Sequence, residues 1–232
     1  MKRRQPRGNP VSDLITQRLS LYLRCLDELE RREVATISSH HLAELFHLSS
    51  AQIRKDLATF GEFGVRGVGY SVADLKRSLI HILGLDRDLK VVIIGAGNLG
   101  MALADYGGFN REGFRIIALF DVAPGKVGGA CRNGTPILHL SELEKVAQRD
   151  GVQIAVLAVP AEVVQSVAEA AAAAGIPALL NFAPARIRIP PAVSVRNVDL
   201  KIQLESLAFR LASTRRAVPV PGKRVRRRPP TP

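Results

Sequence analysis

Cysteine is scarce in this sequence of 232 residues: Cys25 and Cys131 are the only two, and they lack the paired spacing of a metal site. This usage argues against a disulfide framework or a zinc site, and it favours a reducing cytoplasm. No apolar segment follows the basic amino terminus, so we do not expect a secretory signal. We also expect no membrane span, because no apolar run is long enough to cross a bilayer.

Histidine is equally sparse. His40 and His41 are adjacent and are expected on different sides of a helix, so we interpret them and His47, His81 and His139 as ordinary polar residues and expect no metal. After Val159 the chain has no histidine at all. That absence removes the commonest general acid or base from the region where a dehydrogenase would hold its substrate, so we expect no catalytic residues.

Acidic residues are missing from one segment. Residues 213–232 contain seven basic and no acidic residues. Their charge of +7 is more than half of the net charge of +12 of the whole sequence. Their proline- and arginine-rich composition cannot form a core, so we expect a disordered basic tail. The tail either adds salt-sensitive attraction to phosphates or is simply a solubilising end.

Apolar residues at helical spacing predict a first domain at residues 12–84. One long helix carries Ile15, Leu19, Tyr22, Leu26 and Leu29 on a single face. Ser38 or Ser39 would cap a short helix with Leu42, Leu45 and Phe46 facing inward. Ser49 and Gln52 fit a reciprocal capping box that opens a third helix, running to about Phe60. Four glycines between Phe60 and Tyr70 allow a hairpin wing, and Leu75, Leu79 and Leu83 mark a fourth helix.

The third helix has a polar outer face that includes two alanines, Ala51 and Ala58, which would let it approach a surface closely. The order helix, short turn, helix and wing is typical of a winged helix-turn-helix, which would insert this face in the DNA major groove. The local net charge is zero, so a solvated helix face is the alternative. The candidate DNA-binding residues are Ser50, Gln52, Arg54, Lys55, Thr59 and, on the wing, Arg66.

Strand-length apolar runs alternate with helical stretches over residues 88–198. The runs at 90–94, 114–120, 153–159 and 177–182 are separated by helical stretches that include 141–149 and 161–174. This alternation predicts an α/β fold with a parallel sheet and crossover helices.

A glycine-rich turn at residues 95–100 follows the first of these strands and opens a helix. Gly95 permits the tight turn, Gly97 leaves room for a pyrophosphate and Gly100 allows close packing of the helix on the sheet. Asp121, at the end of the next strand, would accept hydrogen bonds from ribose hydroxyls and repel a 2′-phosphate, which favours NAD over NADP. The predicted cofactor-binding residues are Gly95, Ala96, Gly97, Asn98, Leu99, Gly100, Asp121, Val159 and Pro160.

Two other functions use a similar turn. An NAD-dependent dehydrogenase would share the glycines and Asp121, but little chain remains after the sheet to hold a substrate. A coenzyme A or nucleotide module without DNA activity is the second alternative, and Asp121 and the preceding helices disfavour it.

Motifs from both domains together resemble the Rex family of redox-sensing transcriptional repressors over roughly residues 14–211. The resemblance is carried by residues 54–57, 61–64, 66–70, 95–100, 104–106, 120–122, 181–184 and 197–199. It implies a winged helix-turn-helix domain joined to a Rossmann NAD(H)-binding domain, in a homodimer that binds palindromic operator DNA and leaves it when NADH binds.

The resemblance also implies a domain-swapped dimerisation helix at residues 199–212 and a redox-switch network of Arg24, Tyr106 and Asp199. Leu200, Leu204, Leu207 and Leu211 form an apolar stripe on this helix, although periodicity alone allows ordinary packing within one chain. We hypothesise that neutral NADH favours a closed arrangement near residues 181–184 and the partner's last helix, whereas cationic NAD favours the DNA-binding arrangement.

Overall fold

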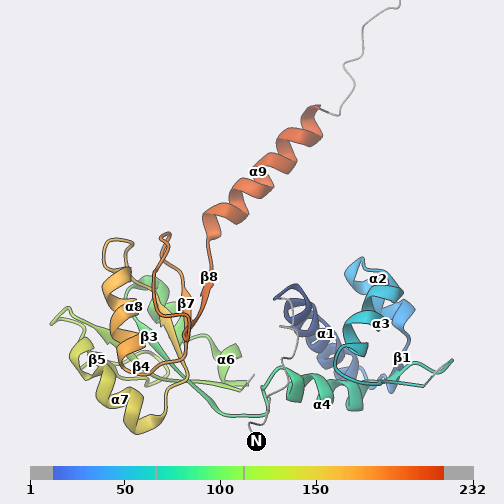
Figure 1. Ribbon diagram of the computed structural model, residues 1–232, viewed down its shortest axis with the longest axis horizontal. Helices are drawn as coiled ribbons and strands as arrows, with labels where there is room; N and C mark the ends of the chain where they lie inside the picture. Colours follow the sequence, from blue (N-terminus) through green and yellow to red (C-terminus); the bar gives the residue numbers. More distant parts are fainter. Residues whose placement is uncertain (1–12, 66, 112, 217–232) are drawn as a thin grey trace, which may run out of the picture. The chain divides into compact units, whose positions relative to one another are not determined.

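The computed structural model describes residues 13–65, 67–111 and 113–216, which form two compact units (Figure 1). The N-terminal unit comprises the described residues up to Leu89 together with Gly107–Arg115, and the C-terminal unit comprises Lys90–Tyr106 and the described residues from Ile116 onward. None of the described helices is long and apolar enough to cross a membrane.

Helices dominate the N-terminal unit, and its first helix packs as its periodicity predicts. Leu19, Tyr22 and Leu26 are fully buried, and α1 packs against α4. The elements are α1 (Asp13–Arg31), β1 (Thr36–Ile37), α2 (Ser39–Phe46), α3 (Ser50–Ala58), β2 (Tyr70–Ser71), α4 (Val72–Ile82) and α6 (Gly107–Arg111).

Serine caps fix where α2 and α3 begin. The Ser38 hydroxyl accepts a hydrogen bond from the His41 amide, and the Ser49 hydroxyl accepts one from the Gln52 amide, both at 3.1 Å. The expectation that Leu45 faces inward is wrong: it is 49% exposed, and Ala43 is buried instead. On a helix Ala43 lies beside buried Leu42, whereas Leu45 is rotated onto the outer side.

The glycine-rich segment after α3 folds back, but its second strand pairs elsewhere than expected. Val65 and Gly69 form a single antiparallel bridge, while Ile37 of β1 pairs with Tyr70 of β2. Gly69 has a φ of +106°, and a Cβ there would lie 2.5 Å from the Ile37 carbonyl oxygen. This close approach of two backbones explains why a glycine stands at this position.

A six-stranded sheet in the order β5-β4-β3-β6-β7-β8 forms the centre of the C-terminal unit. The pairs β4–β5, β3–β6, β6–β7 and β7–β8 are parallel, as the alternation of strands and helices predicts. Helices α7 and α8 pack their apolar residues against the sheet core. The bounds are β3 (Leu89–Ile94), α5 (Asn98–Ala104), β4 (Phe114–Asp121), β5 (Ile137–His139), α7 (Leu143–Asp150), β6 (Ile154–Leu157), α8 (Val164–Ala173), β7 (Ala178–Asn181) and β8 (Ser194–Asn197).

Two of these strands have no counterpart in the sequence prediction. β5 has only three residues, and β8 (SVRN) has no apolar run and is largely exposed at the edge of the sheet. Neither strand has enough hydrophobic periodicity to be recognised without its neighbours.

The last helix, α9 (Leu200–Arg216), has apolar side chains on two opposite sides. The predicted stripe from Leu200 to Leu211 is exposed, and so are Ile202 at 57% and Phe209 at 73%. Because these two residues are seven apart and about 200° around the helix from Leu200, they form a second apolar side that the sequence interpretation missed.

Candidate functional sites

The glycine turn is a backbone structure between β3 and α5. Gly95 has a φ of +106°, and its amide donates to the Phe120 carbonyl at 2.7 Å. A Cβ on Gly100 would collide with the Gly95 carbonyl oxygen, so Gly100 lets the helix approach the turn. A Cβ on Gly97 would meet no atom within 4 Å. The space beside Gly97 is therefore open to a ligand.

Asp121 joins the end of β4 to this turn. Its carboxylate accepts hydrogen bonds from the backbone amides of Ala96 and Ala123, both at 2.9 Å, and from the Lys126 ammonium at 2.9 Å. Burial alone would raise the pKa of Asp121, but these donors outweigh it and hold the pKa below its usual value. The carboxylate is thus ionised and partly neutralised by Lys126, a partner that the sequence interpretation missed.

A cavity of about 450 Å³ lies beside the turn, within the size range of small-molecule sites. Of the predicted cofactor residues, Gly95, Gly97, Asp121, Val159 and Pro160 line it, whereas Ala96, Asn98, Leu99 and Gly100 do not. The other lining residues are Ile94, Phe120, Val122, Lys126, Leu140, Ala158, Val163, Ser166 and Val167. Most of them are apolar residues at strand ends and on α8, where only the folded sheet brings them together.

The motif at residues 181–184 has an internal structural role. Asn181 is fully buried, and its Nδ2 donates to the Ala185 carbonyl at 3.0 Å and to Asn197 Oδ1 at 2.9 Å. Its Oδ1 accepts from the Ala183 amide at 2.9 Å. Asn181 therefore fixes the loop after β7 and ties it to β8.

The outer face of α3 comprises Ala51, Arg54, Lys55, Ala58 and the C-cap residue Thr59, all of which are exposed. The Arg54 guanidinium donates to the Ser39 hydroxyl at 3.1 Å, and the Thr59 hydroxyl donates to the Lys55 carbonyl at 3.1 Å. Ser50 is half-buried in the first turn of the helix. Arg66 lies outside the described residues, as do residues 1–12 and most of the predicted basic tail.

Gln52 behaves differently from the predicted capping box. Its side-chain Nε2 donates to Asp56 Oδ1 at 2.7 Å, and no hydrogen bond joins its side chain to the Ser49 amide in the described part of the chain. Asp56, one of the acidic residues behind the local net charge of zero, is 1% exposed and pairs with Arg18. The outer face of α3 therefore has two cations, Arg54 and Lys55, and no acidic residue.

The histidines of α2 lie near one carboxylate. The Nδ1 atoms of His40 and His41 are each 3.4 Å from a Glu44 carboxylate oxygen, although adjacent residues were expected to face apart. No group of three or more His, Cys, Asp or Glu residues suited to a metal occurs among the residues that the structure describes.

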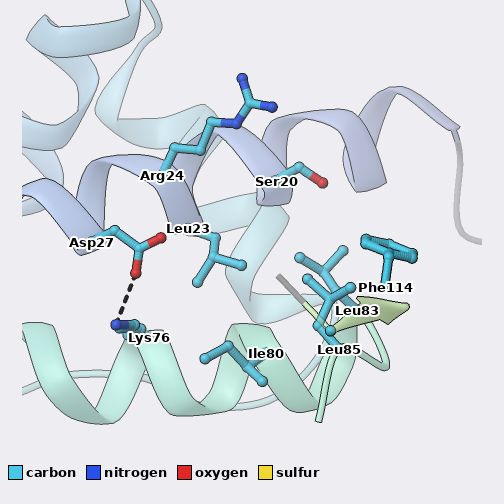
Figure 2. Close-up of a pocket in the computed structure, with 10 residues that line it drawn as sticks. Ser20, Leu23, Arg24, Asp27, Lys76, Ile80, Leu83, Leu85 and Phe114 are labelled. Carbon is cyan, nitrogen blue, oxygen red and sulfur yellow. Dashed lines mark ion pairs between the residues drawn. The ribbon is translucent and has the colours of Figure 1, made fainter. Parts of the chain in front are cut away.

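Arg24 lines a groove of about 440 Å³ between α1 and α4 in the N-terminal unit. Figure 2 shows Leu23, Ile80 and Phe114 in this groove, and Asp27 paired with Lys76 at 2.8 Å, while the Arg24 guanidinium points away from Lys76. Arg24 is exposed, and no ion pair engages it within the described ranges.

The other two residues of the predicted switch network belong to the C-terminal unit. Tyr106 is 58% exposed just after α5. Asp199 precedes α9 and caps its first turn, because its Oδ1 accepts hydrogen bonds from the amides of Lys201 at 2.9 Å and Ile202 at 3.2 Å. The predicted network therefore takes Arg24 from the N-terminal unit and Tyr106 and Asp199 from the C-terminal unit.

Comparison with known proteins matches both units. The family model "Putative DNA-binding protein N-terminus" matches residues 10–58, and "CoA binding domain" matches residues 86–185. The chain is 48% identical to the redox-sensing transcriptional repressor Rex of Desulfitobacterium hafniense, over 86% of this chain and 94% of that protein. It is 47% identical to Rex of Streptomyces coelicolor, over 88% of this chain and 78% of that protein.

Solved structures of a Rex-family repressor share the fold of this chain. The Rex-family repressor RSP in complex with NAD+ and operator DNA superposes with a TM-score of 0.85 at 37% identity, covering 89% of this chain and 95% of RSP. RSP in complex with NADH superposes with a TM-score of 0.81 at 35% identity, covering 89% of this chain and 97% of RSP.

Proposed function

This chain belongs to the Rex family of redox-sensing transcriptional repressors, and we propose that it binds palindromic operator DNA as a homodimer and is released when NADH binds. It is a repressor, not an enzyme. The observation that carries the proposal is the likeness of both units to a repressor solved with NAD+ and operator DNA, and also with NADH. Binding to operator DNA is consistent with the cytoplasmic location that the cysteine usage favours.

DNA binding, dinucleotide binding and dimerisation are each assigned to a separate segment of the chain. DNA binding belongs to a winged helix-turn-helix at residues 12–84, and dinucleotide binding belongs to a Rossmann domain at residues 88–198. Residues 199–212 are the dimerisation helix, and residues 213–232 are a basic tail. The pairing of α2 with α3 and the bridge between Val65 and Gly69 support the first assignment.

The dinucleotide occupies the cavity beside the glycine turn. The open space at Gly97 accommodates the pyrophosphate, near the backbone from Gly95 to Gly100, and Val159 and Pro160 line the same cavity. The Asp121 carboxylate accepts hydrogen bonds from the ribose hydroxyls and repels the 2′-phosphate of NADP. Because Lys126 offsets part of that repulsion, the preference for NAD depends on hydrogen bonding as well as on charge.

The outer face of α3 lies in the DNA major groove. Its alanines permit close approach, while Arg54 and Lys55 offer donors to phosphates and base edges. Ser50 and Gln52 contact the DNA from the same helix, Thr59 does so from its C-cap, and Arg66 does so from the wing.

Helix α9 crosses to the partner subunit in this proposal. Its stripe from Leu200 to Leu211 and its second side, with Ile202 and Phe209, are both exposed in the single chain. A helix that is apolar on two sides suits burial between two surfaces rather than packing on one. The exchange of this helix between subunits would bury both of its apolar sides.

The switch uses three polar side chains, one from the N-terminal unit and two from the C-terminal unit. The Arg24 guanidinium points away from Lys76 (Figure 2), Tyr106 is exposed and Asp199 is half-buried. In the dimer these groups form a network whose arrangement differs between the NADH and NAD+ states. A ligand shifts such an equilibrium only by its differential affinity, and a hundredfold difference, about 2.7 kcal/mol, releases most dimers from a moderately held operator.

The test is a titration of the full-length chain on a labelled palindromic duplex of the family's operator type. Fluorescence anisotropy at fixed salt is followed as NADH, NAD+ or coenzyme A is added. Release by NADH at concentrations where NAD+ and coenzyme A leave the complex intact supports the proposal. Equal responses to NADH and NAD+, or no binding to the duplex, would overturn it.

A further inference from the structure

Asp56 is a buried carboxylate on the helix whose outer face is proposed to meet DNA. Its side chain is 1% exposed, a position that is unfavourable for a charge unless donors surround it. Three side chains provide those donors. Arg18 Nε and Nη2 donate at 2.6 and 2.8 Å, Tyr22 Oη donates at 2.9 Å, and Gln52 Nε2 donates at 2.7 Å.

Two of these donors belong to α1, so the carboxylate joins that helix to α3. Arg18 binds Asp56 in a bidentate fork, which fixes the position of both carboxylate oxygens. Gln52 lies one helical turn before Asp56 and is half-buried, between the core and the outer face of α3. The carboxylate therefore holds Gln52 from its inner side.

The chemistry of this contact decides which way round the Gln52 amide is oriented. An ionised carboxylate only accepts hydrogen bonds, so Gln52 must present its NH₂ group to Asp56 and not its carbonyl oxygen. Hydrogen bonds from Arg18, Gln52 and Tyr22 outweigh the effect of burial and hold the pKa of Asp56 below its usual value. Within the described ranges Gln52 Oε1 and the second hydrogen of Nε2 have no partner.

We propose that Gln52 reads one adenine of the operator and that the Arg18–Asp56 pair is a positioning device that fixes its amide for this purpose. A glutamine pairs with adenine by accepting from N6 and donating to N7, which are the two functions that Gln52 retains. The inference rests on the proposed DNA-binding function of α3. It adds Arg18 and Asp56, neither of which reaches the outer face, as determinants of sequence specificity.

The experiment selects bound duplexes from a pool with a randomised 20-base-pair segment, using the full-length chain without nucleotide. Sequencing gives the base preference at each position for the wild type, Gln52→Ala, Asp56→Asn and the double variant. Asp74→Asn is the matched control for Asp56→Asn, because Asp74 is an exposed residue of α4. Gln148→Ala is the control for Gln52→Ala, because Gln148 also donates to a carboxylate four residues away, on α7.

The wild type should prefer an A·T pair at one position, and Gln52→Ala should weaken that preference about fivefold to 150-fold, the range for a good bidentate contact. Asp56→Asn should weaken the preference at the same position, because an asparagine can donate as well as accept and allows the Gln52 amide to flip. The double variant should match Gln52→Ala, and both controls should match the wild type.

Specific results would overturn the inference. If Gln52→Ala lowers affinity for all sequences equally, or if Asp56→Asn keeps the wild-type preference, Gln52 is not a positioned base reader. Thermal unfolding separates a positioning effect from loss of the fold, and Arg18→Lys, which keeps the charge but loses the fork, should give an intermediate preference. If the wild type enriches no sequence, the proposed operator binding fails together with this inference.

Discussion

At the glycine turn the binding surface is made of backbone, whereas on α3 it is made of side chains held by a buried ion pair. Gly95, Gly97 and Gly100 act through the absence of a side chain, so their effect is local and depends on their spacing. Gln52 depends on Asp56, and Asp56 depends on Arg18, which is 38 residues away in the sequence. A site made of backbone can be recognised from a motif, but a site held by a distant partner requires the fold.

The largest effect should come from removing the buried carboxylate. Asp56→Ala leaves Arg18 without its partner, and breaking such a pair costs about 3–5 kcal/mol. We expect about 3 kcal/mol, because the Arg18 side chain is 22% exposed and keeps some contact with water. Hydrogen exchange with peptide resolution should show a loss of amide protection in α1 and α3 but not in β3 and β6.

Asp74→Ala provides the control for this change, since its ion pair with Arg77 is exposed and should contribute less than about 1 kcal/mol. Equal loss of protection in both units would contradict the view that Asp56 stabilises one of them.

A substitution at the glycine turn should separate binding from folding. Gly97→Ala adds a Cβ that meets no atom within 4 Å, so thermal unfolding without nucleotide should be unchanged. The same methyl group takes space from the pyrophosphate, and NADH affinity should fall at least tenfold, about 1.4 kcal/mol. Titration of NADH fluorescence measures this, with Gly125→Ala, also at an open position, as the control. Unchanged NADH affinity would place the nucleotide elsewhere.

The outer face of α3 should reveal its phosphate contacts through their salt dependence. Lys55→Gln removes one cation and should reduce the slope of log affinity against log salt by about 1, with similar losses on all duplexes. Lys145→Gln, an exposed lysine of α7, should leave the slope unchanged. A loss confined to one duplex sequence would instead make Lys55 a base-reading residue.

The smallest effect is expected at low pH, where protonation of Asp56 reduces its contribution to stability. The folded-state pKa of Asp56 lies below its unfolded value of about 3.9, so its contribution to stability is complete above that pH and is lost as the pH falls through the folded value. The difference in unfolding free energy between the wild type and Asp56→Asn should therefore shrink below about pH 4. Urea unfolding from pH 6 to pH 3 tests this, and a constant difference would mean that the carboxylate is not the ionised partner of Arg18.

Local patterns were sufficient for much of the fold. The periodicity of α1, the caps Ser38 and Ser49 and the glycine turn after β3 depend on neighbours in the chain, and the structure contains all of them. The prediction for Leu45 was wrong because a short amphipathic helix can rotate by one position with little change in its pattern. β5 and β8 were missed because a strand of three or four residues exists only through its neighbours in the sheet.

The sequence by itself determined the α/β order, the glycine turn with Asp121 and the identity of the helix proposed to meet DNA, because spacing within a short segment encodes each of them. Only the tertiary structure decided that Asp56 is buried, that Lys126 neutralises Asp121, and that the cavity is lined from several strands and α8. The reason is physical: burial and ion pairing arise between residues far apart in the chain, and no local pattern specifies which partners meet.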